Sequence, residues 1–103
     1  LVTAPRPLES AGPPAPSGAS ESFKAAMLAL NRGDGRDAAA RFSRFLEQYP
    51  RDPRAEDAAY LRVLAHQRSG DTAELQRAAG YYLRAYPAGF RRREVAALLP
   101  SVP

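Results

Sequence analysis

The titratable side chains of this chain are scattered along the sequence. The chain has one histidine, His66, and no cysteine, so thiolate chemistry and disulfides are excluded. A hydrolytic or acid–base site needs titratable groups that converge, and a zinc site needs ligands at regular spacing. The sequence therefore predicts no enzyme, no metal site and no cofactor, and we expect His66 to line a groove or to face solvent.

Two short motifs that could carry chemistry are better explained as helix ends. Glu56 and Asp57 follow Pro53 in what reads as the first turn of a helix, where negative charge complements the helix dipole. The stretch 33–35 is glycine-rich but lacks the Lys-Ser/Thr ending of a phosphate-binding loop. We interpret the two carboxylates as capping charges and the glycine-rich stretch as a turn between helices.

Arg91, Arg92 and Arg93 are the sharpest charge feature of a chain whose net charge is +4. At the start of a helix, three cations oppose the dipole. They form either a patch for an acidic partner, a lipid headgroup or nucleic acid, or a solvated helix face partly paired with Glu94 or Glu47. Three adjacent residues point in different directions around a helix and cannot all face one surface.

Apolar residues beyond residue 19 recur at helical spacing, as Phe23 and Met27 do. Prolines and Gly-Asp pairs divide this pattern into helices. The predicted helices run from a cap at Ser20 or Ser22 to about Gly33, from Asp34 or Arg36 to Tyr49, from an Asp52 cap with Pro53 at the first helical position to about Ser69, from Asp71 to Tyr86, and roughly from Phe90 to Leu99. The third is expected to bury Tyr60, Val63 and Leu64.

Residues 1–19 contain five prolines and no hydrophobic periodicity, so they cannot contribute to a core. We predict a semi-extended, disordered linker there, either a tether or a disordered end, and a helical domain over residues 20–103. No apolar run approaches the 18 or so residues of a transmembrane helix. The chain starts with leucine, which suggests a fragment or a processed product from which a targeting segment has been removed.

Two blocks of the sequence repeat with a period of 37 residues. Gly33-Asp34 recurs as Gly70-Asp71, Phe45-Leu46 as Tyr82-Leu83, and Tyr49-Pro50 as Tyr86-Pro87. A repeat of about this length built from two helices is typical of an α-solenoid, because one hairpin cannot bury its apolar face alone. We predict an all-α fold with repeat 1 over about 20–50, repeat 2 over about 53–87 and a capping helix over about 90–99.

The run of Gly33-Asp34, Ala38, Phe42, Phe45 and Pro50 resembles the second half of a tetratricopeptide repeat. The first helices match this family poorly. They lack a Trp-x-x-Leu-Gly pattern, and Arg62 stands where a packing residue is expected. The period of 37 exceeds the usual length of about 34, which implies a longer turn between units.

Within this superfamily, residues 45–62 are most similar to repeats of bacterial envelope proteins, including the Tol-Pal coordinator and the lipoprotein of the outer-membrane assembly machine. Residues 82–99 resemble C-terminal repeat modules of myxobacterial membrane-tethered regulators. The resemblance implies a non-catalytic protein–protein interaction module, the C-terminal part of a larger envelope-associated or regulatory protein, in the periplasm or tethered to a membrane.

In tetratricopeptide arrays the first helices line the concave surface where partners dock. The resemblance therefore points to side chains on the predicted third helix, and Tyr81 and the arginine run are candidates from the reasoning on charge and packing. The predicted partner-binding residues are Tyr60, Arg62, His66, Gln67, Tyr81, Arg91, Arg92 and Arg93. Tyr82 and Tyr86 are assigned to packing, whereas Tyr81 lies off that face.

Two other classes of function compete with a protein or peptide partner. A structural or oligomerisation domain would close an uncovered apolar face, at Met27, at Leu30 or at Leu98 and Leu99, against a second copy. An arginine-rich end would alternatively bind an anionic surface or nucleic acid. No small-molecule substrate is expected.

Overall fold

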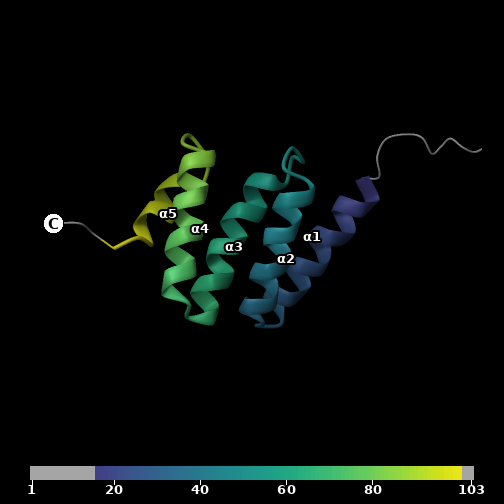
Figure 1. Cartoon of the computed structure of the whole chain (residues 1–103), viewed down its shortest axis with the longest axis horizontal. Helices are drawn as coiled ribbons and strands as arrows, with labels where there is room; N and C mark the ends of the chain where they lie inside the picture. Colours follow the sequence, from purple (N-terminus) through teal and green to yellow (C-terminus); the bar gives the residue numbers. More distant parts are fainter. Residues whose placement is uncertain (1–15, 101–103) are drawn as a thin grey trace, which may run out of the picture.

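The computed structural model describes residues 16–100, which form five helices and no strand. The helices are α1 (Pro16–Asn31), α2 (Gly35–Gln48), α3 (Ala55–Ser69), α4 (Thr72–Ala85) and α5 (Arg92–Ala97). They lie in a row in chain order, each beside the next (Figure 1). The predicted all-α fold, a short solenoid of two hairpins and a last helix, is confirmed.

The two Gly-Asp turns have the same geometry. Gly33 and Gly70 adopt the left-handed backbone, with φ of 88° and 77°, which glycine adopts without steric penalty. The side chains of Asp34 and Asp71 each accept a hydrogen bond from the backbone N–H three residues later, at 3.1 Å in both turns. Both aspartates therefore cap the helix that follows, α2 and α4.

The two Tyr-Pro corners are equally alike. Tyr49 ends α2 with φ −132° and ψ 55°, and Tyr86 ends α4 with φ −131° and ψ 66°. Each donates its backbone N–H to the carbonyl four residues earlier, on Phe45 or Tyr82, at 2.8 Å. The 37-residue period of the sequence is therefore also a period of the backbone.

The core lies along the line where the hairpins stack. Its largest fully buried side chains are Phe42, Phe45, Val63, Tyr82 and Val95. The remaining buried positions are mostly alanines of α2, α3 and α4, whose small side chains let neighbouring helices approach closely. Burying each large side chain contributes roughly 1.5–3 kcal/mol, and the buried leucines Leu30, Leu46 and Leu75 add to the contribution of these five.

Several predicted boundaries are wrong. α1 begins at Pro16, so Ser20 and Ser22 lie inside the helix and do not cap it. α3 begins at Ala55, because Asp52 instead makes a tight turn in which its Oδ1 accepts the N–H of Arg54 at 2.8 Å. α5 is shorter than predicted, with only six residues.

The packing of α3 also differs from the prediction. Val63 is fully buried, whereas Tyr60 and Leu64 are only half-buried. The predicted linker spanned residues 1–19, but residues 16–19 are the first residues of α1. Its residues 1–15 lie outside the described residues. Within residues 16–100, no helix combines the length and apolar character needed to cross a membrane.

Candidate interaction surfaces

Two hollows lie on different sides of α3, and the predicted partner-binding residues divide between them. The first-helix groove, as we call it, is lined by side chains of α1 and α3 and by the residue that precedes α5. They are Phe23, Met27, Asp57, Tyr60, Leu61 and Arg91, around a hollow of about 290 Å³. The second hollow, of about 280 Å³, lies between α2, α3 and the start of α4.

The wall of the first-helix groove is mostly apolar. Phe23, Met27, Tyr60 and Leu61 are half-buried and pack against the core on their inner sides. Phe23 meets Phe45 edge to face, with ring centroids 5.5 Å apart. These side chains therefore present apolar surface that the fold of residues 16–100 leaves partly open to solvent.

Arg91 gives one end of this groove a fixed charge. Its guanidinium lies over the ring of Tyr60, 4.9 Å from the centroid, and its Nη1 donates to Glu94 at 3.3 Å. The bond to Glu94 is the main cause that raises the pKa of Arg91. Arg54, 37 residues earlier, lies over Phe23 at 5.8 Å in the same way, so the cation–aromatic pair is part of the repeat.

A partly buried hydrogen-bond network holds the backbone of Arg91 in place. The Tyr82 hydroxyl donates to Glu56 Oε2 at 2.6 Å and accepts the Arg91 N–H at 2.9 Å. The same Glu56 oxygen accepts the N–H of Phe90 at 2.9 Å. Burial, followed by the bond to Glu56, raises the pKa of Tyr82 to about 12. The network ties the start of α5 to α3 and α4.

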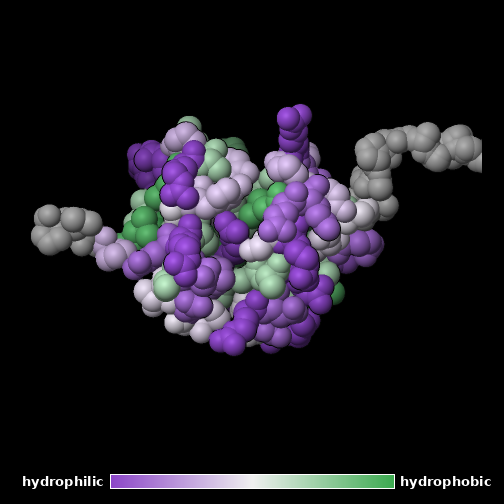
Figure 2. Space-filling model, viewed as in Figure 1, coloured by the Kyte–Doolittle hydropathy of each residue, from purple (hydrophilic) through white to green (hydrophobic). Residues whose placement is uncertain are grey.

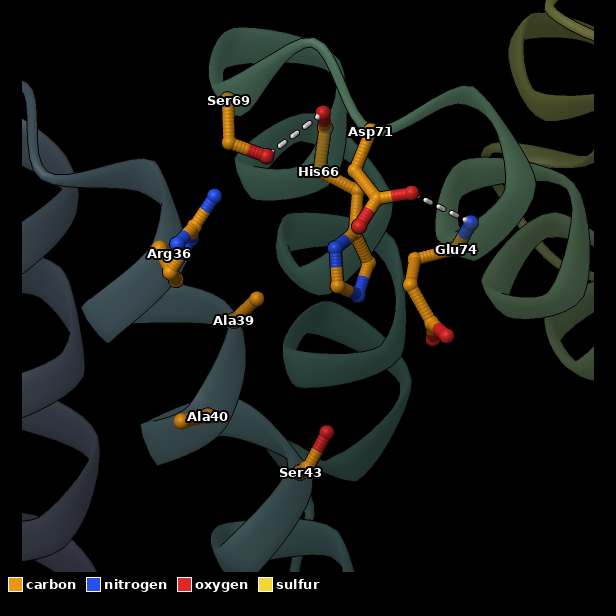
Figure 3. Close-up of a pocket in the computed structure, with 8 residues that line it drawn as sticks. All are labelled: Arg36, Ala39, Ala40, Ser43, His66, Ser69, Asp71 and Glu74. Carbon is orange, nitrogen blue, oxygen red and sulfur yellow. Dashed lines mark hydrogen bonds between the residues drawn. The ribbon is translucent and has the colours of Figure 1, made fainter.

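The second hollow is polar and is drawn in Figure 3. It is lined by Arg36, Ala39, Ala40, Ser43, His66, Ser69, Asp71 and Glu74. The imidazole of His66 points into its centre from α3, with Asp71 and Glu74 on one side and Arg36 on the other (Figure 3). Burial lowers the pKa of His66, which favours the neutral imidazole.

Arg62 fills the gap between α2, α3 and α4. Its Nη1 donates to Ser43 at 3.2 Å, and its guanidinium lies over the ring of Tyr81 at 5.0 Å. Its Nε is buried without a partner within the described residues, and burial lowers its pKa. Arg62 thus takes the position of a packing residue, and its aliphatic stem and planar guanidinium pack between the helices.

The structure brings only two of the eight predicted residues, Tyr60 and Arg91, together in the first-helix groove. His66 lies in the other hollow, and Arg62 stacks on Tyr81, which is 36% exposed as expected for a residue off the packing face. Gln67, Arg92 and Arg93 are exposed. The sequence predicted an ion pair of the arginine run with Glu94 or Glu47. Arg91 forms the ion pair with Glu94, and within residues 16–100 no ion pair joins the arginine run to Glu47.

Sequence reasoning missed four groove residues, Phe23, Met27, Asp57 and Leu61. Phe23 was treated as core, and Met27 was expected on an uncovered apolar face but not in this groove. The first helices place apolar residues on a face that one following helix cannot fully cover. Within residues 16–100, no three His, Asp or Glu side chains gather in a way that could hold a metal ion. The groove combines apolar side chains with the guanidinium of Arg91 and the carboxylate of Asp57.

The stacked hairpins, the Gly-Asp turns and the Tyr-Pro corners define a short tetratricopeptide-like helical repeat. Residues 16–98 match the family model YfiO, described as outer membrane lipoprotein. The match covers most of the chain, so the chain belongs to this family, and the predicted likeness to bacterial envelope proteins is confirmed. No curated protein and no solved structure gives a significant match. Membership indicates a protein-interaction module of the cell envelope, in a family that is typically non-catalytic.

Proposed function

We propose that this chain binds a segment of a partner protein in the first-helix groove. The observation that supports this most is the set of half-buried apolar side chains, Met27, Tyr60 and Leu61, beside a cation held over an aromatic ring. Burial of a partner's apolar side chain there contributes affinity. Arg91 and Asp57 set the orientation of the bound segment.

The second hollow supports partner binding less well. Its wall is formed largely by charged and polar groups and by alanines, so a partner would gain little from burial there. Its neighbour Arg62 is already engaged with Ser43 and Tyr81. By contrast, the apolar side chains of the first-helix groove gain buried area only when something docks on them.

The magnitude of the gain can be worked from single side chains. Burying one leucine-sized side chain contributes roughly 1.5–3 kcal/mol, and an acidic group of the partner near Arg91 adds orientation more than affinity. A micromolar complex needs a net free energy of about 8 kcal/mol after an association cost of about 4–15 kcal/mol. Two or three such anchors supply about 3–9 kcal/mol of the gross amount, so a partner segment must also make contacts along the rest of the groove.

A matched pair of substitutions tests the proposal. Leu61→Lys places a charge in the groove, whereas Ala40→Lys places the same charge at an exposed position of the other hollow. Each variant is expressed with an affinity tag as the full-length protein in its own bacterium, and co-purifying proteins are quantified by mass spectrometry. We expect Leu61→Lys to lose the partner at least about tenfold, a change of about 1.4 kcal/mol, and Ala40→Lys to retain it.

Circular dichroism confirms that both variants keep their helices. The proposal is contradicted if the folded Leu61→Lys variant retains the same partner protein. It is also contradicted if the partner protein is lost only from the Ala40→Lys variant.

A further inference from the structure

The segment 84–93, which joins α4 to α5 and which we call the arginine tip, differs from its counterpart in the first repeat. It contains four arginines and no acidic residue, whereas the segment 47–56 contains two arginines and three acidic residues. Phe90 stands at the position of Pro53 and is 95% exposed. Figure 2 shows strongly hydrophilic side chains at the upper left, where α4 ends and α5 begins. Two corners with the same backbone geometry therefore carry different surfaces.

The fold holds Phe90 in this exposed position. The backbone N–H of Phe90 donates to Glu56 Oε2, and that of Gly89 donates to the carbonyl of Tyr86, both at 2.9 Å. A Cβ on Gly89 would lie 2.5 Å from both Glu56 Oε2 and the Tyr82 hydroxyl, so the turn needs glycine to approach this network closely. An apolar ring on a fixed backbone loses little conformational freedom when it docks.

Three arginines of the tip are open to an anionic surface. Arg84, Arg92 and Arg93 are exposed, and within residues 16–100 no salt bridge engages them. Arg92 and Arg93 spread around the start of α5, but helical side chains lean toward the N-terminal end of their helix. Both can therefore reach past the end of the stack on which the tip lies, the upper end in Figure 1.

We propose that the arginine tip binds the surface of an anionic lipid bilayer. The ring of Phe90 inserts among the headgroups, and the three exposed arginines pair with lipid phosphates. Segments that bind at the bilayer interface combine an aromatic side chain with neighbouring cations in this way. Each arginine near such a surface contributes about fivefold in affinity, which corresponds to about 1 kcal/mol. Arg91 stays over Tyr60, so the tip binds lipid whether or not the first-helix groove holds a partner.

A bilayer fits this surface better than a partner protein does. Phe90 protrudes from the turn with 95% of its area exposed, and a protein could bury such a ring only in a pocket of matching shape. The interfacial layer of a bilayer accepts the ring without a preformed pocket. A stable protein interface buries about 1,200–2,000 Å² in total, which is more than a turn of this size supplies.

A single tryptophan tests the insertion. The chain has no tryptophan, so Phe90→Trp places one reporter at the tip of the 103-residue chain. We expect its emission to shift to the blue, and brominated acyl chains to quench it, with vesicles of phosphatidylcholine and phosphatidylglycerol but not with phosphatidylcholine alone. Leu28→Trp is the matched control at an exposed apolar position of α1, and we expect neither effect from it.

Co-sedimentation with the same vesicles tests the contribution of each side chain. We expect Phe90→Ala and Arg93→Glu each to lower the partition coefficient at least about fivefold. Leu28→Ala and Arg36→Glu are the controls, with expected changes below about twofold, because Arg36 lies at the opposite end of the stack and distant charges are screened. Arg36 and Arg93 are both the second residue of a helix, α2 and α5. Circular dichroism confirms that the variants keep their helices.

The proposal is overturned if the tryptophan at position 90 stays in water while the chain sediments with the vesicles. Equal effects of Arg36→Glu and Arg93→Glu also overturn it, because net charge alone would then explain the binding. So does tip-dependent binding to polyglutamate or duplex DNA without binding to the anionic vesicles, which would assign the tip to another macromolecule.

Discussion

Replacing Tyr82 by phenylalanine tests the network that fixes α5. The substitution keeps the ring, and the equivalent position of the first repeat is already a fully buried phenylalanine, Phe45. What disappears is the hydroxyl, which donates to Glu56 at 2.6 Å and accepts the Arg91 N–H at 2.9 Å. The variant therefore isolates two hydrogen bonds from the packing of the side chain.

A hydrogen bond to a charged group contributes about 1.5–3 kcal/mol, and an unsatisfied backbone N–H adds to the cost. We expect Tyr82→Phe to lower the free energy of unfolding by about 2–3 kcal/mol, measured by urea denaturation followed by circular dichroism. Tyr86→Phe is the matched control, because Tyr86 is half-buried at the corner of the same helix, and we expect a loss below about 0.5 kcal/mol. Equal effects of the two substitutions would refute the role given to the network.

The remaining predictions concern titration and the converse substitution. Because the pKa of Tyr82 is raised from 10 to about 12, the folded state favours the neutral phenol. The neutral phenol contributes its full stabilisation below pH 10, and this contribution is lost as the pH rises through 12, by up to about 2.7 kcal/mol. Alkaline unfolding of the wild type, compared with that of Tyr82→Phe, measures the loss. Burial lowers the pKa of His66, so proton NMR of this lone histidine should show titration below pH 6.5, with stability declining as the pH falls through that pKa. Phe45→Tyr should destabilise the fold by about 1–3 kcal/mol, because the new hydroxyl would be buried without a hydrogen-bond partner. The residue equivalent to Glu56 in the first repeat is Ala19, which has no side-chain acceptor. An unchanged denaturation midpoint would contradict this prediction.

The sequence was sufficient for the features that depend on local chemistry. The left-handed glycines, the aspartate caps and the Tyr-Pro corners each follow from residue types within a few positions, and each recurs at the predicted interval. The start of α1 was misplaced because a proline at the first helical position carries no apolar periodicity. The start of α3 was misplaced because Asp52 can form either a cap or a tight turn.

The candidate groove depended on contacts that are distant in sequence. Tyr60 and Arg91 were both predicted to contact a partner, but nothing in their spacing showed that they touch. Their contact follows from the bond between Glu56 and Tyr82, which joins residues 26 positions apart. Tyr60 and Leu64 were predicted to be buried because periodicity identifies an apolar face, and it does not show how much of that face a neighbouring helix covers.

The most direct test of the proposed function maps which face of the stack touches the partner. A photo-crosslinking amino acid is placed in the full-length protein at Leu61, in the first-helix groove, and separately at Ala40, in the second hollow. After irradiation in the native bacterium, our account predicts a discrete protein adduct from position 61 and none from position 40. An adduct from position 40 alone would contradict it.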